Sequence, residues 1–245
     1  MDINGAVVLV TGASAGIGEA TARAAARAGG RLVLLARRED RIQKLAEELG
    51  NAVGIGCDVT DADQIARAVA AAIGKFGRID VLVNNAGQGL QAAIEEIEPD
   101  DFRDLLNLNV VAPLMMIQAV LPHMVHQGSG SIVNISSGIT FAPLPCTAAY
   151  NSSKAALNML SSVARGELAS KNIAVSTMYP SITNTEFVDA IKAGKEAAEA
   201  VAVHSGLDIH EPEEVAAKIL DLIRTGDERA DTVPPAFGGT YLRQA

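Results

Sequence analysis

The chain has 245 residues, of which 49% are hydrophobic and 20% are charged, so it can bury one sizeable core, and we expect a single domain over residues 1–245. A net charge of −9 argues against nucleic-acid binding by the surface as a whole, although it leaves room for a local basic site for a phosphate. Aromatic residues make up only 3%, so Ala, Val, Leu and Ile build the core, as is typical of a parallel sheet covered by helices.

The sequence indicates neither a metal site nor a disulfide framework. Cys57 and Cys146 are the only cysteines, and a reactive thiol at Cys146 is an alternative to a structural role. His123 and His126 lie near a helix end without a carboxylate nearby, so we expect them to be surface residues. Strand-like residues begin by Ala6, which leaves no N-terminal signal segment, and no apolar run reaches the ~18 residues that span a membrane. We therefore expect a cytoplasmic protein that binds no membrane.

Short apolar runs alternate with longer amphipathic stretches along the chain. We expect strands at Ala6–Thr11, Leu32–Ala36, Ala52–Cys57, Ile79–Val83, Ser131–Ser137 and Ile173–Tyr179. The expected helices are Ile17–Ala28, a charged helix that ends at Leu49, Asp61–Ile73 with Asp61 as its N-cap, Asp100–His126, Ala148–Ser170 and Glu211–Arg224. Six successive βα units predict a single-domain α/β Rossmann fold, a doubly wound parallel sheet of six to seven strands with helices on both faces.

Two prolines and one stretch interrupt this pattern. Pro113 is expected to bend the helix Asp100–His126, and Pro122 to bend or end it. The stretch Ile182–Leu207 is Ala- and Glu-rich and weakly periodic. We expect a substrate lid at 182–207, with a plain surface helix as the alternative. The tail after Thr225 is ambiguous.

A glycine-rich loop follows the first strand. Gly12, Gly16 and Gly18 have the spacing GxxxGxG between a strand and a helix, with Ser14 and Ile17 among them. Such a loop allows a tight turn and lets backbone N–H groups approach a pyrophosphate at the positive end of the helix. A flexible turn is the alternative, but the position at the first βα junction favours a dinucleotide site.

Arg37 and Arg38 follow the second strand, where an acidic residue would bind the ribose 2′-OH of NAD and arginine accommodates the 2′-phosphate of NADP. We therefore favour NADP(H) over NAD(H), although a charged helix start is the alternative. Asp58, which is followed by Val59 at the end of the third strand, could accept a hydrogen bond from the adenine amino group or cap the next helix.

Tyr150 and Lys154 lie four residues apart on an expected helix, so they share a face. A nearby ammonium favours the phenolate, and we expect it to lower the pKa of Tyr150 from its ordinary value near ~10. Ser137, at the end of the fifth strand, could hold a carbonyl oxygen while the tyrosine exchanges a proton with it. The trio suits carbonyl–alcohol chemistry, although alone the pair is also compatible with a surface helix that carries an extended lysine.

Taken in order, these residues resemble the short-chain dehydrogenase/reductase family over about residues 5–185. Its motifs correspond here to the glycine loop with Thr11, Asn84-Asn85-Ala86-Gly87 after the fourth strand, Asn109, Ser137, Tyr150, Lys154, and Pro180 followed by Thr185. The chain departs from the family at Ser181, which is usually glycine, and at Ala15, which is basic in many NADP-dependent members. It also lacks the Asp-Gly-Gly ending common in 3-oxoacyl carrier-protein reductases.

The resemblance implies an NADPH-dependent carbonyl reductase that acts on a small-molecule carbonyl or alcohol. Ser137 would donate a hydrogen bond, Tyr150 would donate the proton, Lys154 would also bind the nicotinamide ribose, and Asn109 would hold a water. The alternatives are an NADPH-binding sensor or scaffold without turnover and a 3-oxoacyl thioester reductase; a Rossmann-like methyltransferase would not need Tyr150 and Lys154. The resemblance further implies a homotetramer or homodimer formed through the two long helices. The candidate pocket residues are Gln88, Ile139, Phe141, Leu144 and Phe187.

Overall fold

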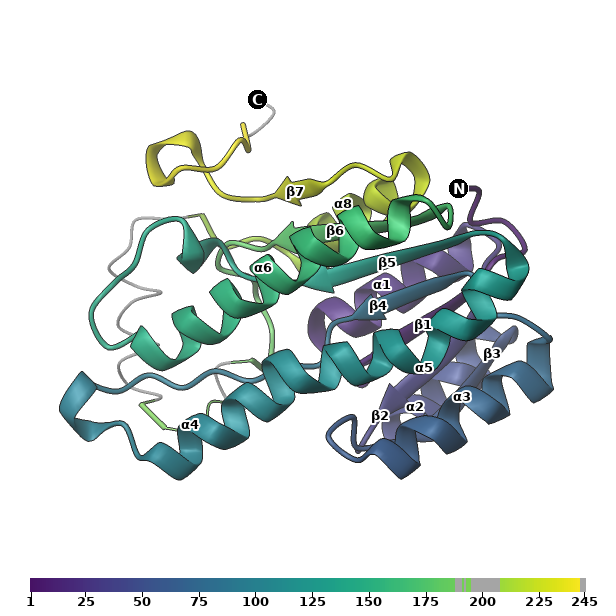
Figure 1. Cartoon of the computed structure of the whole chain (residues 1–245), viewed down its shortest axis with the longest axis horizontal. Helices are drawn as coiled ribbons and strands as arrows, with labels where there is room; N and C mark the ends of the chain where they lie inside the picture. Colours follow the sequence, from purple (N-terminus) through teal and green to yellow (C-terminus); the bar gives the residue numbers. More distant parts are fainter. Residues whose placement is uncertain (188–190, 192, 195–207, 243–245) are drawn as a thin grey trace.

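Seven parallel strands form one sheet in the order β3-β2-β1-β4-β5-β6-β7 in the computed structural model, which describes residues 1–187, 191, 193–194 and 208–242 (Figure 1). The strands are β1 (Val7–Thr11), β2 (Arg31–Ala36), β3 (Ala52–Gly56), β4 (Val81–Asn84), β5 (Gly130–Ile135), β6 (Ile173–Tyr179) and β7 (Arg229–Asp231). This sheet confirms the expected doubly wound α/β fold of six to seven strands.

Helices cover both faces of the sheet. One layer consists of α1 (Gly16–Arg27), α2 (Glu39–Leu49) and α8 (Pro212–Thr225), and the other of α3 (Ala62–Phe76), α5 (Ala112–Gln127) and α6 (Ala148–Ala169). Successive side chains of β1 point to opposite faces, so Val8 and Val10 pack against the first layer and Val7 and Leu9 against the second. All four are fully buried, which explains why this strand is a continuous apolar run rather than an alternating one.

The expected long helix at Asp100–His126 consists of three parts. After α4 (Pro99–Leu106) comes a wider π-helical turn, Asn107–Val111, and then α5. The N–H of Ala112 donates to the carbonyl oxygen of Asn107, five residues earlier. Pro113 has no N–H to donate, so the expected bend is absorbed by this turn at the start of α5. Pro122 does not end the helix, which continues to Gln127.

The helical run Pro99–Gln127 is also long and apolar enough to cross a membrane by length and composition. The expectation that no apolar run reaches that length was therefore wrong. The buried side of α5, including Met116, Val120 and Met124, packs in the core with β4, β5 and α3. That packing accounts for part of the run's apolar composition, since 39% of its apolar window is buried, and core helices of soluble proteins pass the same test.

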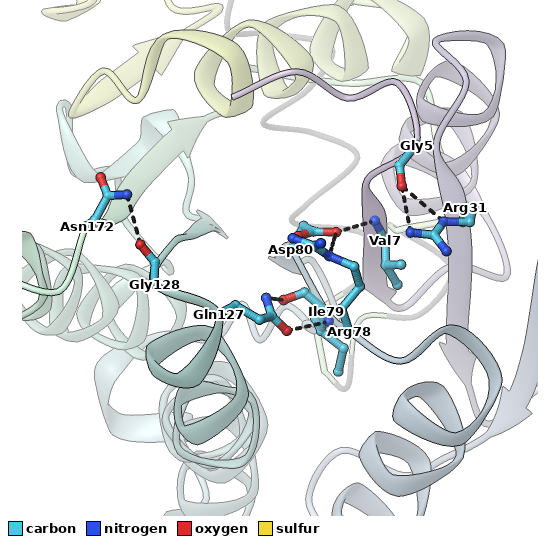
Figure 2. A network of polar contacts seen from close by, with 9 residues as sticks. All are labelled: Gly5, Val7, Arg31, Arg78, Ile79, Asp80, Gln127, Gly128 and Asn172. Carbon is cyan, nitrogen blue, oxygen red and sulfur yellow. Dashed lines mark hydrogen bonds and ion pairs between the residues drawn. The ribbon is translucent and has the colours of Figure 1, made fainter.

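A polar network joins the amino ends of the strands, at the edge of the sheet opposite the carboxyl ends (Figure 2). The carboxylate of Asp80 accepts the N–H of Val7 at 2.8 Å and pairs with the guanidinium of Arg78 at 2.6 Å. Nearby, the side chain of Gln127 bonds both backbone groups of Ile79, accepting at 3.1 Å and donating at 2.9 Å. This edge is therefore closed by internal hydrogen bonds.

The tail after α8 forms β7 and a short 3₁₀ turn, Pro235–Phe237, neither of which was predicted. Asp231 at the end of β7 accepts the N–H groups of Val233 and Thr240 at 3.0 and 2.9 Å, which brings the tail back to the end of β7.

Most of the expected lid at 182–207 lies outside the described residues. Its first part, up to Phe187, is described and lies against the glycine-rich loop.

Candidate active site

The chain order of the sheet reverses between β1 and β4, because β1 leads to β2 on one side while β4 leads to β5 on the other. In open α/β sheets, ligands bind outside the carboxyl ends of the strands at such a point. A cavity of about 1070 Å³ lies there, lined by residues that follow β1 to β6. We call it the central cavity.

The glycine-rich loop forms one wall of the central cavity and is held by the residues after β4. Thr11 Oγ1 accepts the N–H groups of Asn85 and Ala86, both at 3.0 Å. The Asn85 side-chain amide donates to the carbonyl oxygens of Thr11 at 2.9 Å and Gly12 at 3.2 Å. The Asn-Asn-Ala-Gly segment thus fixes the turn in place.

The glycines of this loop have no room for a side chain. A Cβ on Gly18 would stand 2.4 Å from the carbonyl oxygen of Gly12, and one on Gly12 would stand 2.9 Å from the Cα of Ala86. Gly16 has a φ of +56°, and its Cβ would meet the Thr185 methyl group at 2.9 Å. The loop therefore packs tightly around its own backbone at the start of α1, and Gly12 and Gly16 line the cavity without a side chain, which lets a pyrophosphate approach their backbone. By this test the residues present fit a dinucleotide.

The ends of β2 and β3 supply the polar groups at one end of the central cavity. Arg37, Arg38, Asp58 and Val59 line it, as expected for the adenosine end. Arg38 donates to Ser14 Oγ at 3.0 Å, which ties the basic group to the glycine-rich loop. Asp58 does not cap the next helix, because its carboxylate accepts the N–H and hydroxyl of Thr60 at 2.9 and 2.7 Å. Asp61 caps α3, as predicted.

Ser137, Tyr150 and Lys154 meet at the other end of the central cavity, as predicted. A chain of buried amides positions α6 on the sheet, since Asn84 donates to Asn134 and Asn134 donates to Ser161, both at 2.8 Å. This places the first turns of α6 over the end of β5, where Ser137 follows.

The electrostatics of the pair differ from the expectation. Burial raises the pKa of Tyr150 to about 12, and a side-chain hydrogen bond with Ser137 lowers it only in part. Burial also lowers the pKa of Lys154 to about 8. The Lys154 ammonium donates to the carbonyl oxygen of Ile135 at 2.9 Å and lies 5.9 Å from the centre of the Tyr150 ring. The predicted lowering of the pKa of Tyr150 was therefore wrong for this arrangement, because desolvation outweighs the distant ammonium.

Asn109 lies fully buried in the π-helical turn behind the cavity wall. Its side chain accepts the N–H of Gln88 at 3.0 Å and donates to the carbonyl oxygen of Gln88 at 2.9 Å and to Ser153 Oγ at 3.0 Å. A Cβ on Gly87 would stand 3.2 Å from Asn109 Oδ1 and 3.4 Å from Lys154 Nζ. Asn109 thus fixes the strand-end segment that lies beside Lys154, and π-turns of this kind are frequent at functional sites.

The other predicted residues divide into those that line the central cavity and those that support it. Gly18 and Asn109 do not line the cavity but pack behind it. The lining does include Gly12, Ser14, Gly16, Ile17, Asn85, Ala86, Gly87, Pro180 and Thr185. Of the candidate pocket residues, Gln88, Ile139, Leu144 and Phe187 line it, whereas Phe141 does not and packs on Tyr179 with ring centres 4.8 Å apart.

Some lining residues escaped the sequence reasoning. Val233 and Phe237 come from the tail, where the strand of three residues is too short to show a periodic pattern. Gln91 also lines the cavity, and its side-chain oxygen is buried without a hydrogen-bond partner among the described residues. A loop glutamine carries no sequence signal for that position.

Ser181, in place of the usual glycine, causes no strain, because its φ is not in the left-handed region.

The two free cysteines differ in position, since Cys57 lines the central cavity and Cys146 does not. Burial raises the pKa of the Cys57 thiol to about 11, which keeps it protonated. Cys146 does not line the central cavity. Among the described residues, no group of three or more His, Cys, Asp or Glu side chains could hold a metal ion.

A cavity at the switch point, a glycine-rich phosphate loop and a Ser–Tyr–Lys cluster together define a dinucleotide-dependent oxidoreductase. The family model described as short chain dehydrogenase matches residues 6–196. The chain therefore belongs to the short chain dehydrogenase family, and it is an enzyme that acts on CH–OH or carbonyl groups of small molecules with a nicotinamide cofactor.

Known proteins of different specificity resemble the chain. It is 33% identical to the 3-oxoacyl-[acyl-carrier-protein] reductase of Thermotoga maritima over 228 residues, which cover 91% of this chain and 92% of that one. A short chain dehydrogenase from Burkholderia phymatum in complex with NAD has a TM-score of 0.88 at 25% identity, with 97% and 92% of the two chains covered. An alcohol dehydrogenase from Thermococcus sibiricus complexed with 5-hydroxy-NADP has a TM-score of 0.80 at 28% identity, with 92% and 95% covered. The family thus includes structures with either nicotinamide cofactor.

Proposed function

We propose that the protein is an NADPH-dependent carbonyl reductase. The observation that carries the proposal is a single cavity lined both by Ser137, Tyr150 and Lys154 near the end of β5 and by Arg37 and Arg38 after β2, with β1 and β4 between the two groups. The first group suits proton transfer to a carbonyl oxygen, and the second suits a 2′-phosphate. No acidic residue follows β2 directly to bind a free ribose 2′-OH, because Arg37 and Arg38 occupy those positions.

Each side chain has a distinct task in this proposal. A reduced nicotinamide, when bound, supplies hydride to the carbonyl carbon. Ser137 donates a hydrogen bond to the carbonyl oxygen as negative charge grows there. Tyr150, which is protonated at neutral pH, donates its phenolic proton to that oxygen. Lys154 would bind the nicotinamide ribose, and Asn109 holds the segment beside it.

Of the two alternatives, one has specific support. The similarity to a 3-oxoacyl-[acyl-carrier-protein] reductase favours a 3-oxoacyl thioester as substrate. An NADPH-binding sensor or scaffold without turnover would bind NADPH in the same central cavity, but it would have no need of the Ser–Tyr–Lys cluster.

We also propose that the protein is a cytoplasmic homotetramer or homodimer. Apolar side chains are exposed along the two long helices, among them Met159 at 67% and Val163 at 52% on α6, and Val125 at 43% on α5. Met159 and Val163 are four residues apart and share a face of α6, and exposed apolar faces favour self-association. Light scattering of the purified protein and of Met159→Glu tests this, since the variant is expected to dissociate.

The decisive experiment measures NADPH consumption with ketones, aldehydes, quinones, ketosteroids and 3-oxoacyl thioesters, with NADH in parallel. Tyr150→Phe is expected to bind NADPH but to lose nearly all turnover. Tyr179→Phe is the matched control, because Tyr179 packs on Phe141 outside the central cavity and is expected to keep turnover. Turnover by Tyr150→Phe would refute the proton-transfer role. NADPH binding without turnover of any compound would favour the sensor.

A further inference from the structure

Arg38, one of the two arginines proposed to bind the 2′-phosphate, and the nearby Arg41 are both bound to a carboxylate of this chain. Arg38 Nη1 lies 2.7 Å from Glu186 Oε2, and Arg41 Nη1 lies 2.9 Å from both carboxylate oxygens. Arg38 is the N-cap of α2, and Arg41 lies in its first turn, so both side chains come from one helix start. Glu186 lies in the segment that follows β6, 148 residues further along the chain than Arg38.

Glu186 occupies the place where an anion would bind. Arg38, Glu186 and Ser14 all line the central cavity, and Arg38 also donates to Ser14 Oγ at 3.0 Å. The carboxylate therefore lies beside the glycine-rich loop at the end of β2, the position at which arginines of this fold bind a ribose 2′-phosphate.

The backbone holds Glu186 in this position. The preceding Thr185 packs on Gly16, where a Cβ would be only 2.9 Å from its methyl group. Asn184 donates its N–H to the carbonyl oxygen of His210 at 2.9 Å, and the N–H of Phe187 bonds Thr185 Oγ1 at 3.2 Å. The ion pairs thus follow from the path of the chain across the loop.

The ion pairs with Arg38 and Arg41 favour the charged form of Glu186, but they are exposed enough for a phosphate to replace the carboxylate. Hydrogen bonds from Arg38 and then Arg41 lower the pKa of the Glu186 carboxyl group. The side chains of Arg38 and Glu186 remain 45% and 51% exposed, so water screens the ion pair. A phosphate has about −1.5 to −2 charges and three acceptor oxygens, against one charge and two oxygens for the carboxylate.

We propose that Glu186 competes with the 2′-phosphate of NADP(H) for Arg38 and Arg41, and so sets the ratio of NADP(H) to NAD(H) affinity. NAD(H) has no 2′-phosphate and leaves the ion pairs in place. NADP(H) must displace the carboxylate of Glu186. The free energy of the arginine–phosphate attraction is therefore reduced by the cost of breaking the ion pairs. The inference rests on the proposed function only in placing the 2′-phosphate at these arginines.

The test is a comparison of dissociation constants by calorimetry for NADPH, NADH, 2′,5′-ADP and 5′-AMP. Glu186→Gln keeps the shape of the side chain and removes its charge. Glu213→Gln is the control, because Glu213 lies with Glu186 beside Gly16 but makes no ion pair with either arginine among the described residues.

Glu186→Gln is expected to bind NADPH and 2′,5′-ADP about 3- to 10-fold more tightly, while NADH and 5′-AMP change less than about twofold, as follows from removing two screened ion pairs. Glu213→Gln is expected to change all four by less than about twofold. Unchanged or weaker NADPH binding by Glu186→Gln, or equal shifts for NADPH and NADH, would overturn the inference.

Arg38→Ala separates this inference from the proposed cofactor preference. If Arg38→Ala weakens NADPH binding and Glu186→Gln has no effect, the preference is supported and the competition is refuted. If Arg38→Ala leaves NADPH binding unchanged, the 2′-phosphate does not bind at these arginines and both fail. If the wild type binds NADH more tightly than NADPH but Glu186→Gln reverses the order, the competition is supported and the NADP preference of the wild type is wrong.

Discussion

Replacing Asp80 by alanine is expected to lower the free energy of unfolding by about 2–3 kcal/mol, because two different interactions depend on this carboxylate. Asp80 is buried directly before β4 and accepts the N–H of Val7, the first residue of β1, at 2.8 Å (Figure 2). It also pairs with the guanidinium of Arg78. The substitution removes the acceptor that joins the two central strands at their amino ends.

The larger part of the loss comes from Val7. Val7 is fully buried, so its N–H cannot form a new hydrogen bond with water. Leaving a buried donor unpaired costs about 1–3 kcal/mol. The Arg78 side chain is 47% exposed, so its ion pair contributes at most about 1 kcal/mol. Asp80→Asn keeps an oxygen that can accept from Val7 and loses the charge, so its loss should be smaller than that of Asp80→Ala.

Urea unfolding of the wild type and the variants measures these differences. Asp221→Ala is the control, because Asp221 is 63% exposed in its pair with Arg224 and its loss should stay within about 0.5 kcal/mol. If Asp80→Ala is no less stable than Asp221→Ala, the Val7 hydrogen bond does not stabilise the sheet edge. If Asp80→Asn loses as much as Asp80→Ala, the charge rather than the hydrogen bond dominates.

Three further predictions follow from the site. Gly18→Ala should abolish NADPH binding in a titration, because its Cβ would stand 2.4 Å from a carbonyl oxygen of the loop, whereas Gly74→Ala, with nothing within 4 Å, should bind normally. Thr11→Val should cost about 1–3 kcal/mol in urea unfolding by removing the acceptor of the Asn85 N–H, and Thr11→Ser should restore most of it. The stability of the wild type relative to Lys154→Met should rise from about pH 8 to pH 10, since the pKa of Lys154 is about 8 when folded and 10.5 in its ordinary state, so the unfolded chain binds more protons there. A difference that stays flat with pH would contradict the buried-lysine reasoning.

The parts of the fold that local sequence determines were predictable. The strand β6 has the bounds Ile173–Tyr179 that its apolar run predicts, and Asp61 caps α3 as its position before the helix suggests. The π-helical turn at Asn107–Val111 was not predictable in this way, because the apolar pattern continues across it. The strand β7 was missed because Arg229–Asp231 is too short to show a period and depends on pairing with β6.

The candidate site divides in the same way. Tyr150 and Lys154 share a helix face because they are four residues apart, and the glycine loop is a local signal at the end of a strand. The ion pairs of Glu186 join segments that are distant in sequence, so no local pattern indicates them. The position of Gln91 in the cavity likewise depends on how its loop packs.

The direction of the pKa shift at Tyr150 bears on the proposed direction of the reaction. Proximity on a helix predicts that Lys154 stabilises the phenolate, but in the structure burial raises the pKa of Tyr150 and the lysine bonds the end of β5 through Ile135. A protonated phenol hydrogen-bonded to Ser137 can donate to a growing alkoxide at once, whereas oxidation of an alcohol first needs a phenolate that burial disfavours. The unliganded arrangement therefore has Tyr150 in the protonation state that reduction requires, and we expect the oxidation rate to rise with pH as the phenolate forms.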